Sequence, residues 1–190
     1  MALEELFPIA ARHGEGRRQA AWLFLLIAAG FVSSFTFACV TPFSAFALLS
    51  EATLTLPRAL AVMAAIWLVN QIIGYLALGY PLDGLSMTWG ATIGIAALAG
   101  TAVAAAIVAV ARAWPLWSRL AAGFVAAIVA YEAVLFLAAL VLGGSGNFAP
   151  GIVAKVALSD TGWLIGLAIL RHGMLRFGLL RRDGPRPVTT

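Results

Sequence analysis

The sequence contains few charged residues and a single cysteine, and each shortage excludes a class of protein. Only 11% of the 190 residues are charged, against about 25% in soluble domains, so the chain could not cover a water-exposed surface. One cysteine, Cys39, excludes a disulfide scaffold. Apolar residues make up 63% of the chain, which excludes a disordered protein. The composition therefore predicts an integral membrane protein in contact with the lipid bilayer, without a large extramembrane domain.

The basic residues give a net charge of +4, but they separate apolar runs and do not form one patch. Arginines stand before, between and after the runs: Arg12, Arg17, Arg18, Arg58, Arg112, Arg119, Arg171, Arg176, Arg181, Arg182 and Arg186. This distribution is typical of membrane-topology signals and not of a nucleic-acid-binding surface.

Apolar runs of about 20 residues are long enough to cross the hydrocarbon core of a bilayer. The clear examples are residues 19–39, 58–80, 86–111 and 118–142, and the run 151–172 is apolar apart from Lys155 and Asp160. The segment 41–57 differs because it is short, contains Glu51 and lies between prolines. About 16 residues at 1.5 Å each reach only about 24 Å, so it would have to stand upright or lie where the bilayer is thin.

The positive-inside rule decides whether the segment 41–57 crosses. With five crossings, nearly every basic residue from Arg58 onward would lie outside. With six, these residues lie on the same side as Arg17 and Arg18. We therefore predict an all-α, polytopic bundle of six transmembrane helices in the inner (plasma) membrane, with both termini cytoplasmic. Its parts are a cytoplasmic N-terminal segment 1–18, a transmembrane domain 19–175 and a basic cytoplasmic tail 176–190.

Small residues at four-residue spacing let helices approach closely in a bilayer. The first predicted span carries two such pairs, Ala29 with Ser33 and Gly30 with Ser34, and the fourth carries Gly90 with Gly94. These faces either pack within the chain or dock another subunit, and the spacing leaves both interpretations open.

Five polar or ionisable residues interrupt the predicted spans: Asn70, Gln71, Glu132, Lys155 and Asp160. An ionisable group inside the bilayer costs about 2.5–3.5 kcal/mol on insertion scales, so it is a candidate for function. In one interpretation these residues line a polar cavity that opens outward, with Lys155 attracting an anionic group. In the other they only hydrogen-bond between helices while Lys155 reaches the surface.

No set of catalytic residues lies at one depth of the predicted bundle. The GGSG sequence at Gly143–Gly146 is similar to the G-x-S-G of intramembrane serine proteases. Ser145 is predicted outside and His172 inside, however, about 30 Å apart in depth. His13 and His172 are likewise separated from Cys39, which argues against a metal site. The sequence also lacks a G-x-x-x-x-G-K-[ST] phosphate-binding loop. We predict that the protein is not an enzyme and has no intrinsic cofactor or metal.

Aromatic residues gather toward the predicted outer side: Phe35, Phe37, Phe43, Phe46, Tyr80, Trp89 and Phe148. An aromatic belt at the membrane interface accounts for this pattern. A ligand pocket is the alternative, because Cys39, Asp83, Asn147 and Lys155 are predicted at the same depth. An aromatic wall with a few polar groups is what a small-molecule site requires.

In architecture, residues 19–175 resemble the substrate-binding S component of energy-coupling-factor vitamin transporters, with six short spans, no soluble domain and small residues four apart in the first helix. The resemblance implies a small vitamin or cofactor as ligand, and a coupling membrane subunit and ATPases as partners. It places the docking face at Ala29 and Ser33, with Gly30 and Ser34 beside them, although Ser33 departs from the family's usual pair of alanines. The pocket would draw on Cys39, Thr41, Phe43, Tyr80, Asp83, Trp89, Asn147 and Lys155.

Two further alternatives remain open at this point. An outward Cys39 would suit the cobalt of a corrinoid, which favours the cobalamin-type members of that family, but Cys39 is equally interpreted as a small packing residue. A non-catalytic accessory subunit of a larger membrane complex would also need only small-residue faces and a lipid-facing exterior, and the sequence supplies both.

Overall fold

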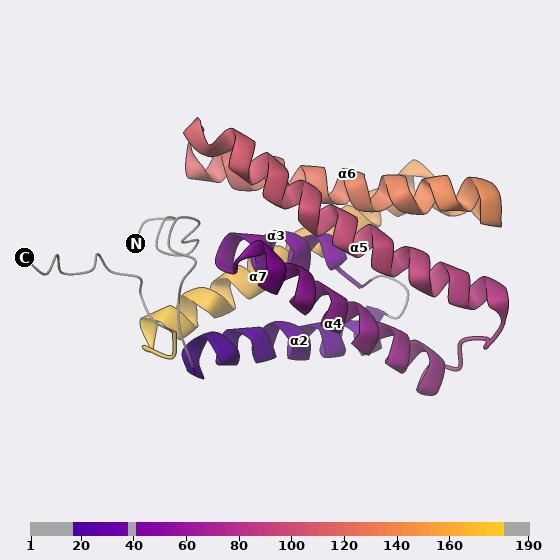
Figure 1. The fold of residues 1–190 in the computed structure, drawn as a ribbon, viewed down its shortest axis with the longest axis horizontal. Helices are drawn as coiled ribbons and strands as arrows, with labels where there is room; N and C mark the ends of the chain where they lie inside the picture. Colours follow the sequence, from indigo (N-terminus) through magenta and orange to yellow (C-terminus); the bar gives the residue numbers. More distant parts are fainter. Residues whose placement is uncertain (1–16, 38–40, 181–190) are drawn as a thin grey trace, which may run out of the picture.

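The described residues, 17–37 and 41–180 of the computed structural model, form six α-helices (Figure 1). They are α2 (Arg17–Phe37), α3 (Phe43–Thr53), α4 (Leu56–Leu76), α5 (Gly84–Val110), α6 (Leu116–Leu142) and α7 (Pro150–Arg176). Two short 3-10 helices, η1 (Ala111–Ala113) and η2 (Ser145–Phe148), occupy connections between them. No strand occurs in this part of the chain, so the predicted all-α class is confirmed for it.

Four of the helices are long and apolar enough to cross a membrane: Leu56–Leu76, Gly84–Ala113, Leu116–Leu142 and Pro150–Arg176. In α2 the apolar stretch, Ala20–Phe35, is shorter. Large apolar side chains stand on the outer faces of the helices, and Leu76, Val110 and Val141 are more than 80% exposed. Lipid is the solvent in which such side chains are stable on a surface, so the helices fit a membrane-embedded protein.

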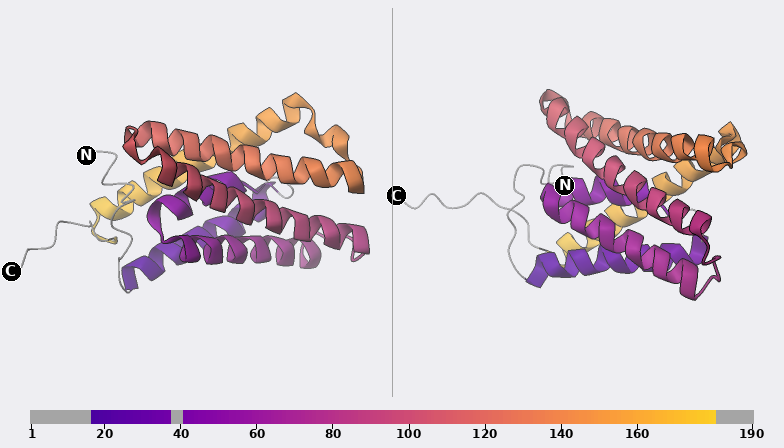
Figure 2. Two further views of the ribbon diagram at one scale, coloured as in Figure 1. Left: turned by 45° about the horizontal axis from the view of Figure 1, so that its top comes forward. Right: turned by 45° about the vertical axis from the view of Figure 1, so that its right-hand side comes forward.

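The chain reverses direction at each connection (Figure 1). The start of α2, the α3–α4 and α5–α6 connections and the end of α7 lie at one end of the bundle, and the other two connections described, α4–α5 and α6–α7, lie at the opposite end (Figures 1 and 2). We call the first the basic end, because Arg58, Arg112 and Arg119 lie in or beside its connections, and the second the far end. These three arginines thus lie at one end of the bundle.

Helix α3 differs from the predicted second span. It has 11 residues, and at 1.5 Å per residue it is about 16 Å long, roughly half of the hydrocarbon thickness. All of its residues are buried, because α4, α5, α6 and α7 pack around it (Figures 1 and 2). The expectation of an upright lipid-spanning helix is therefore corrected, since a helix enclosed by other helices need not match the bilayer.

Local sequence explains where several helices begin and end. Leu54 leaves α3 in an extended conformation, and Pro57 occupies the first turn of α4, where a missing N–H is tolerated. Asp83 caps α5 by accepting a hydrogen bond from the backbone N–H of Ser86 at 2.7 Å. Gly143 follows α6 with φ of 89°, a conformation that favours glycine.

Small residues bring the helices together inside the chain. A methyl group at Gly30 of α2 would lie 2.7 Å from Ile66 of α4, and one at Gly94 of α5 would lie 2.6 Å from Trp67. Ser33 and Ser34 are fully buried, and both hydroxyls donate to the carbonyl of Gly30. Packing within the chain therefore accounts for these residues, as one of the two sequence interpretations expected.

Candidate ligand-binding cavity

Two adjoining chambers lie within the bundle toward the far end. The α4–α5 chamber has a volume of about 220 Å³ and is lined by Thr41, Phe43, Asn70, Gln71, Tyr75, Tyr80, Ser86, Trp89, Gly90, Ile93 and Tyr131. The α6–α7 chamber has a volume of about 560 Å³ and is lined by Thr41, Trp89, Ile93, Tyr131, Glu132, Leu135, Gly144, Phe148, Ile152 and Val156. Thr41, Trp89, Ile93 and Tyr131 line both. The volume of the α6–α7 chamber is within the range of pockets that hold small organic ligands, about 300–1,000 Å³, and the α4–α5 chamber is smaller.

The short length of α3 explains why space remains at this place. Helix α3 begins near the middle of the bundle and runs toward the basic end (Figure 1). Thr41 and Phe43, at its start, line the chambers. The long helices α5 and α6 continue past this point to the far end. The interior is thus filled by α3 in one half and left open to the chambers in the other.

Asn70 organises the polar wall of the α4–α5 chamber. Its Nδ2 donates to the hydroxyl oxygen of Ser34 at 3.1 Å and to that of Thr41 at 2.8 Å. Its Oδ1 accepts a hydrogen bond from Nε2 of Gln71 at 3.1 Å. Because the Ser34 hydroxyl itself donates to Gly30, these bonds connect α2, α4 and the segment before α3. The network fixes the orientation of an amide at the edge of an otherwise apolar interior.

Close backbone contact between α4 and α5 shapes the same chamber. Trp67 donates from Nε1 to the carbonyl oxygen of Gly90 at 2.8 Å, and the hydroxyls of Tyr75 and Ser86 lie 3.4 Å apart. A side chain at Gly90 would collide with Gln71. Gly90 therefore gives the Gln71 amide room to face the chamber.

Aromatic rings form most of the remaining walls. Phe43 and Tyr131 stack at 5.7 Å between ring centroids, and Tyr75 and Tyr80 meet edge to face at 6.2 Å. Phe148 of η2 meets Phe136 of α6 edge to face at 5.4 Å. Paired rings offer a large and rigid contact area, which suits a planar ligand.

The two intramembrane acids have different surroundings. Asp160 of α7 is only 2% exposed and accepts hydrogen bonds from both the backbone N–H and the hydroxyl of Ser44, in the first turn of α3. Pro42, at the cap position of α3, supplies no side-chain bond, so Asp160 serves as the cap from another helix. Glu132 of α6 is half-buried and lines the α6–α7 chamber.

The structure brings together four of the eight predicted pocket residues, Thr41, Phe43, Tyr80 and Trp89, which line the chambers. Asn70, Gln71 and Glu132, for which a polar cavity was one of the two sequence interpretations, also line them. Cys39 lies outside the described residues, and the side chain of Asn147 is not among those described.

Two predicted pocket residues do not line either chamber. Asp83 is exposed and caps α5, and Lys155 is exposed on α7. Their depth along the chain is close to that of the pocket, but depth alone does not say which face of a helix a residue occupies. The pocket is corrected accordingly.

Sequence reasoning missed several lining residues, mainly Tyr75, Ser86, Tyr131, Leu135, Ile152 and Val156. A signal existed for some of them. Tyr75 follows Gln71 by four residues, and Val156 follows Ile152 by four, so each pair shares a helix face. Tyr131 is adjacent to Glu132 and gave no such signal.

Buried polar residues also occur toward the basic end. Trp22 of α2 donates to the hydroxyl of Thr53 at 2.9 Å, and the guanidinium of Arg171 lies 5.1 Å from the centre of the Trp22 ring. Glu51 of α3 and Arg171 of α7 are both buried. Arg171, which the sequence analysis grouped with the arginines around the apolar runs, is thus buried within the bundle.

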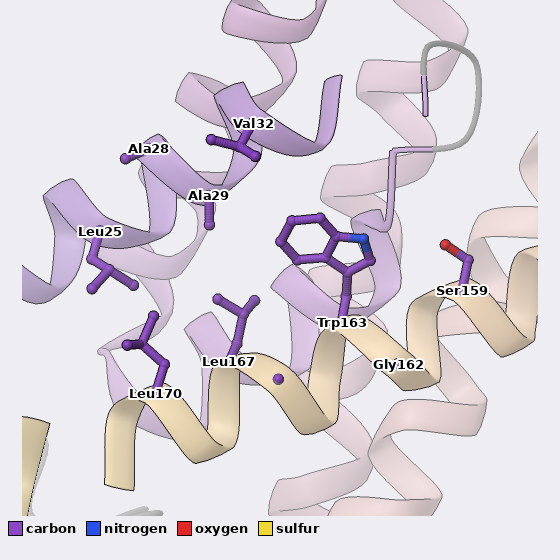
Figure 3. Close-up of a pocket in the computed structure, with 10 residues that line it drawn as sticks. Leu25, Ala28, Ala29, Val32, Ser159, Gly162, Trp163, Leu167 and Leu170 are labelled. Atoms are coloured by element: carbon purple, nitrogen blue, oxygen red, sulfur yellow. The ribbon is translucent and has the colours of Figure 1, made fainter. Parts of the chain in front are cut away.

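An apolar groove of about 760 Å³ separates α2 from α7. Leu25, Ala28, Ala29 and Val32 of α2 line one side, and Ser159, Gly162, Trp163, Gly166, Leu167 and Leu170 of α7 line the other. In Figure 3, Trp163 and Leu167 rise from α7 toward Ala29. Nothing lies within 4 Å of where a side chain would begin at Gly162 or Gly166. Of the predicted docking residues, only Ala29 lines this groove, while Gly30, Ser33 and Ser34 are buried.

No family profile, curated protein or solved structure matches this chain. The class of the protein therefore follows from its own geometry, which is that of a membrane-embedded helical bundle with an aromatic and polar cavity near one end.

Proposed function

We propose that the protein is a membrane-embedded binding subunit that captures a small vitamin or cofactor and takes part in its transport. The observation that carries this proposal is the pair of chambers. Amide groups from Asn70 and Gln71 stand on one wall, and the rings of Trp89 and Tyr131 stand where the chambers meet. A planar ligand with hydrogen-bonding groups at its edge matches both features.

We also propose the membrane topology that the sequence predicts. Six crossings with both termini cytoplasmic would put the basic end inside and the chambers near the outer surface. Here α3, although half-length, would serve as the second crossing together with the segment before it. A ligand would then enter from outside, the direction required of an uptake protein.

Separate partners would supply the energy, because the sequence has no phosphate-binding loop of the G-x-x-x-x-G-K-[ST] type. We propose that a transmembrane helix of a coupling subunit occupies the groove between α2 and α7. Ala28 and Ala29 on one side and Gly162 and Gly166 on the other would let its backbone approach closely.

The ligand we favour is of vitamin size. A corrinoid was the first choice from the sequence because of Cys39, and it stays a hypothesis that rests on that residue alone. The described walls, by contrast, favour a compact ring system, because each chamber is small and bounded by aromatic side chains.

The test is ligand binding by the purified full-length chain in lipid nanodiscs. The compounds are the common vitamins, cobalamin and its precursors, and a ligand should raise the melting temperature. In the variant Trp89→Ala that increase should disappear, whereas the control Trp117→Ala, at a side chain 65% exposed on α6, should keep it. No increase with any compound, together with purification in a stoichiometric larger complex, would contradict the proposal.

The open groove favours a second candidate, an accessory subunit that stabilises a larger membrane complex. An apolar groove with two unfilled glycines needs no ligand cavity to be useful. The neighbouring genes distinguish the candidates. ATPase, coupling-protein or cofactor-synthesis genes support uptake, and genes of a large complex support the accessory role.

A further inference from the structure

Among the described residues that line the α6–α7 chamber, Glu132 is the one with an acidic side chain. Neither chamber has a lysine or arginine among its lining residues in the described part of the chain. Lys155, on the nearby turn of α7, is exposed and does not line the chamber. The positive charge that would balance Glu132 is therefore not supplied by the chamber itself.

Glu132 also makes no hydrogen bond or ion pair with any of the residues that the structure describes. An acidic side chain in the low-dielectric interior of a membrane protein needs a partner, and such a residue marks a functional site by default. In contrast to Glu132, Asp160 has its partner in Ser44.

A second acid, Asp160, lies one helical turn of α7 beyond the residues that line the chamber. Ile152, Val156 and Asp160 are four residues apart on one face of α7, and the first two line the chamber. Asp160 is thus one helical turn further along α7 than Val156, the last lining residue. There it contacts Ser44 in the first turn of α3. It is only 2% exposed, and its Oδ1 makes no hydrogen bond, although its other oxygen accepts from Ser44. Asp160 thus adds a second carboxyl group on the same face of α7 as the lining residues Ile152 and Val156.

The walls next to Glu132 are aromatic. Tyr131 and Trp89 line both chambers, and Phe148 lines the α6–α7 chamber from η2. The faces of aromatic rings attract cations, most strongly in tryptophan and more so when water is excluded. Carboxylate and rings together form a surface that recognises a positive charge attached to an organic group.

We infer that the ligand of this cavity is an organic cation with a ring, such as an amine or a positively charged nitrogen heterocycle. The positive nitrogen lies at Glu132 in the α6–α7 chamber, and the ring lies against Trp89 and Tyr131 toward the α4–α5 chamber. The inference rests on the proposed function and adds the charge of the ligand. It also reverses the sequence interpretation in which Lys155 attracts an anionic group.

A series of matched probes tests the sign of the charge. Phenethylammonium, 2-phenylethanol and 3-phenylpropanoate share a ring and a two-carbon chain and carry a positive, a neutral and a negative end group at pH 7. Their affinities are measured by calorimetry on the full-length chain in nanodiscs. We expect the cation to bind at least about tenfold more tightly than the alcohol, and the anion most weakly.

Two variants test whether the preference for the cation depends on Glu132. Glu132→Gln keeps the size of the side chain and removes the charge, so cation and alcohol should bind within about twofold of each other. The alcohol should bind the variant as it binds the native chain, which controls for folding. Lys155→Gln is the control for charge at the outer surface, and it should preserve the preference.

Three results would overturn the inference: equal or tighter binding of the alcohol or the anion to the native chain, a preference for the cation that survives Glu132→Gln, or no binding of any probe. None of these removes the proposed function, which is decided by the vitamin compounds and by Trp89→Ala. Binding of a vitamin without preference for cations would leave a binding subunit for neutral or anionic ligands.

Discussion

Replacing Asn70 by leucine tests whether the polar wall of the α4–α5 chamber holds three parts of the chain together. The substitution removes the hydrogen bonds to Ser34, Thr41 and Gln71. It leaves the bond from Ser34 to the carbonyl of Gly30 in place. Two of the lost bonds join α4 to α2 and to the segment before α3, whereas the bond from Gln71 lies within α4.

The expected magnitude follows from the number of bonds. A hydrogen bond between membrane helices contributes about 0.6 kcal/mol on average, so the two bonds that leave α4, to Ser34 and Thr41, contribute about 1.2 kcal/mol to the free energy of unfolding. For a chain of this size, about 2–4 °C of melting temperature corresponds to 1 kcal/mol. Asn70→Leu should then melt about 2–5 °C below the native chain.

Unfolding in mixed micelles, followed by circular dichroism, measures this difference. The matched control is Thr88→Ala on α5, whose exposed hydroxyl bonds only to the carbonyl of Gly84. It should change the free energy of unfolding by less than about 0.5 kcal/mol. A double-mutant cycle with Asn70→Ala and Ser34→Ala should give a coupling of about 0.6 kcal/mol for that single bond.

The reasoning would be refuted by a coupling near zero between Asn70 and Ser34, or by a leucine variant as stable as the native chain. In either case the polar side chains would not join the helices. A variant that keeps its stability and loses ligand binding would assign Asn70 to the ligand alone.

Two further predictions concern topology and packing. A reporter that is active only in the periplasm should give no signal when fused after Thr190, and a strong signal would contradict the six-crossing topology. Gly94→Ala should lower the free energy of unfolding by about 1–3 kcal/mol, because its methyl group would lie 2.6 Å from Trp67. Gly162→Ala, in open space on α7, is the control and should have little effect on stability; equal effects of the two substitutions would argue against the packing of α5 on α4.

Composition and arginine positions were enough to predict the coarse fold. Of the six predicted spans, the four at 58–80, 86–111, 118–142 and 151–172 correspond to helices long and apolar enough to cross a membrane, whereas the apolar stretch of the first, Ala20–Phe35, is shorter. Arg58, Arg112 and Arg119 lie toward one end of the bundle. These features are encoded locally, by the length of apolar runs and by the charges between them. The environment of each run is not encoded in this way, because hydropathy does not distinguish a helix in lipid from one enclosed by other helices.

The sequence predicted how deep in the bundle the cavity lies, but not which helix faces line it. Trp89 and Tyr80 lie in it, whereas Asp83, only three residues after Tyr80, caps a helix. Which face of a helix points inward depends on packing against distant parts of the chain. Tyr131 illustrates the point, since its place beside Phe43 of α3 follows from contacts between helices far apart in sequence.

Helix α3 connects these observations. Because it begins near the middle of the bundle, its first N–H groups would lie unsatisfied in the interior of a membrane, where water is excluded. Asp160 supplies the missing acceptor from α7, and Thr41, just before the helix, bonds to Asn70 of α4. The Asp160 carboxyl accepts from the N–H of Ser44 and the Asn70 amide donates to the hydroxyl of Thr41, so the start of α3 is held by side chains of α7 and α4, two of the helices around the cavity. A ligand that displaces these side chains would therefore act directly on the start of α3.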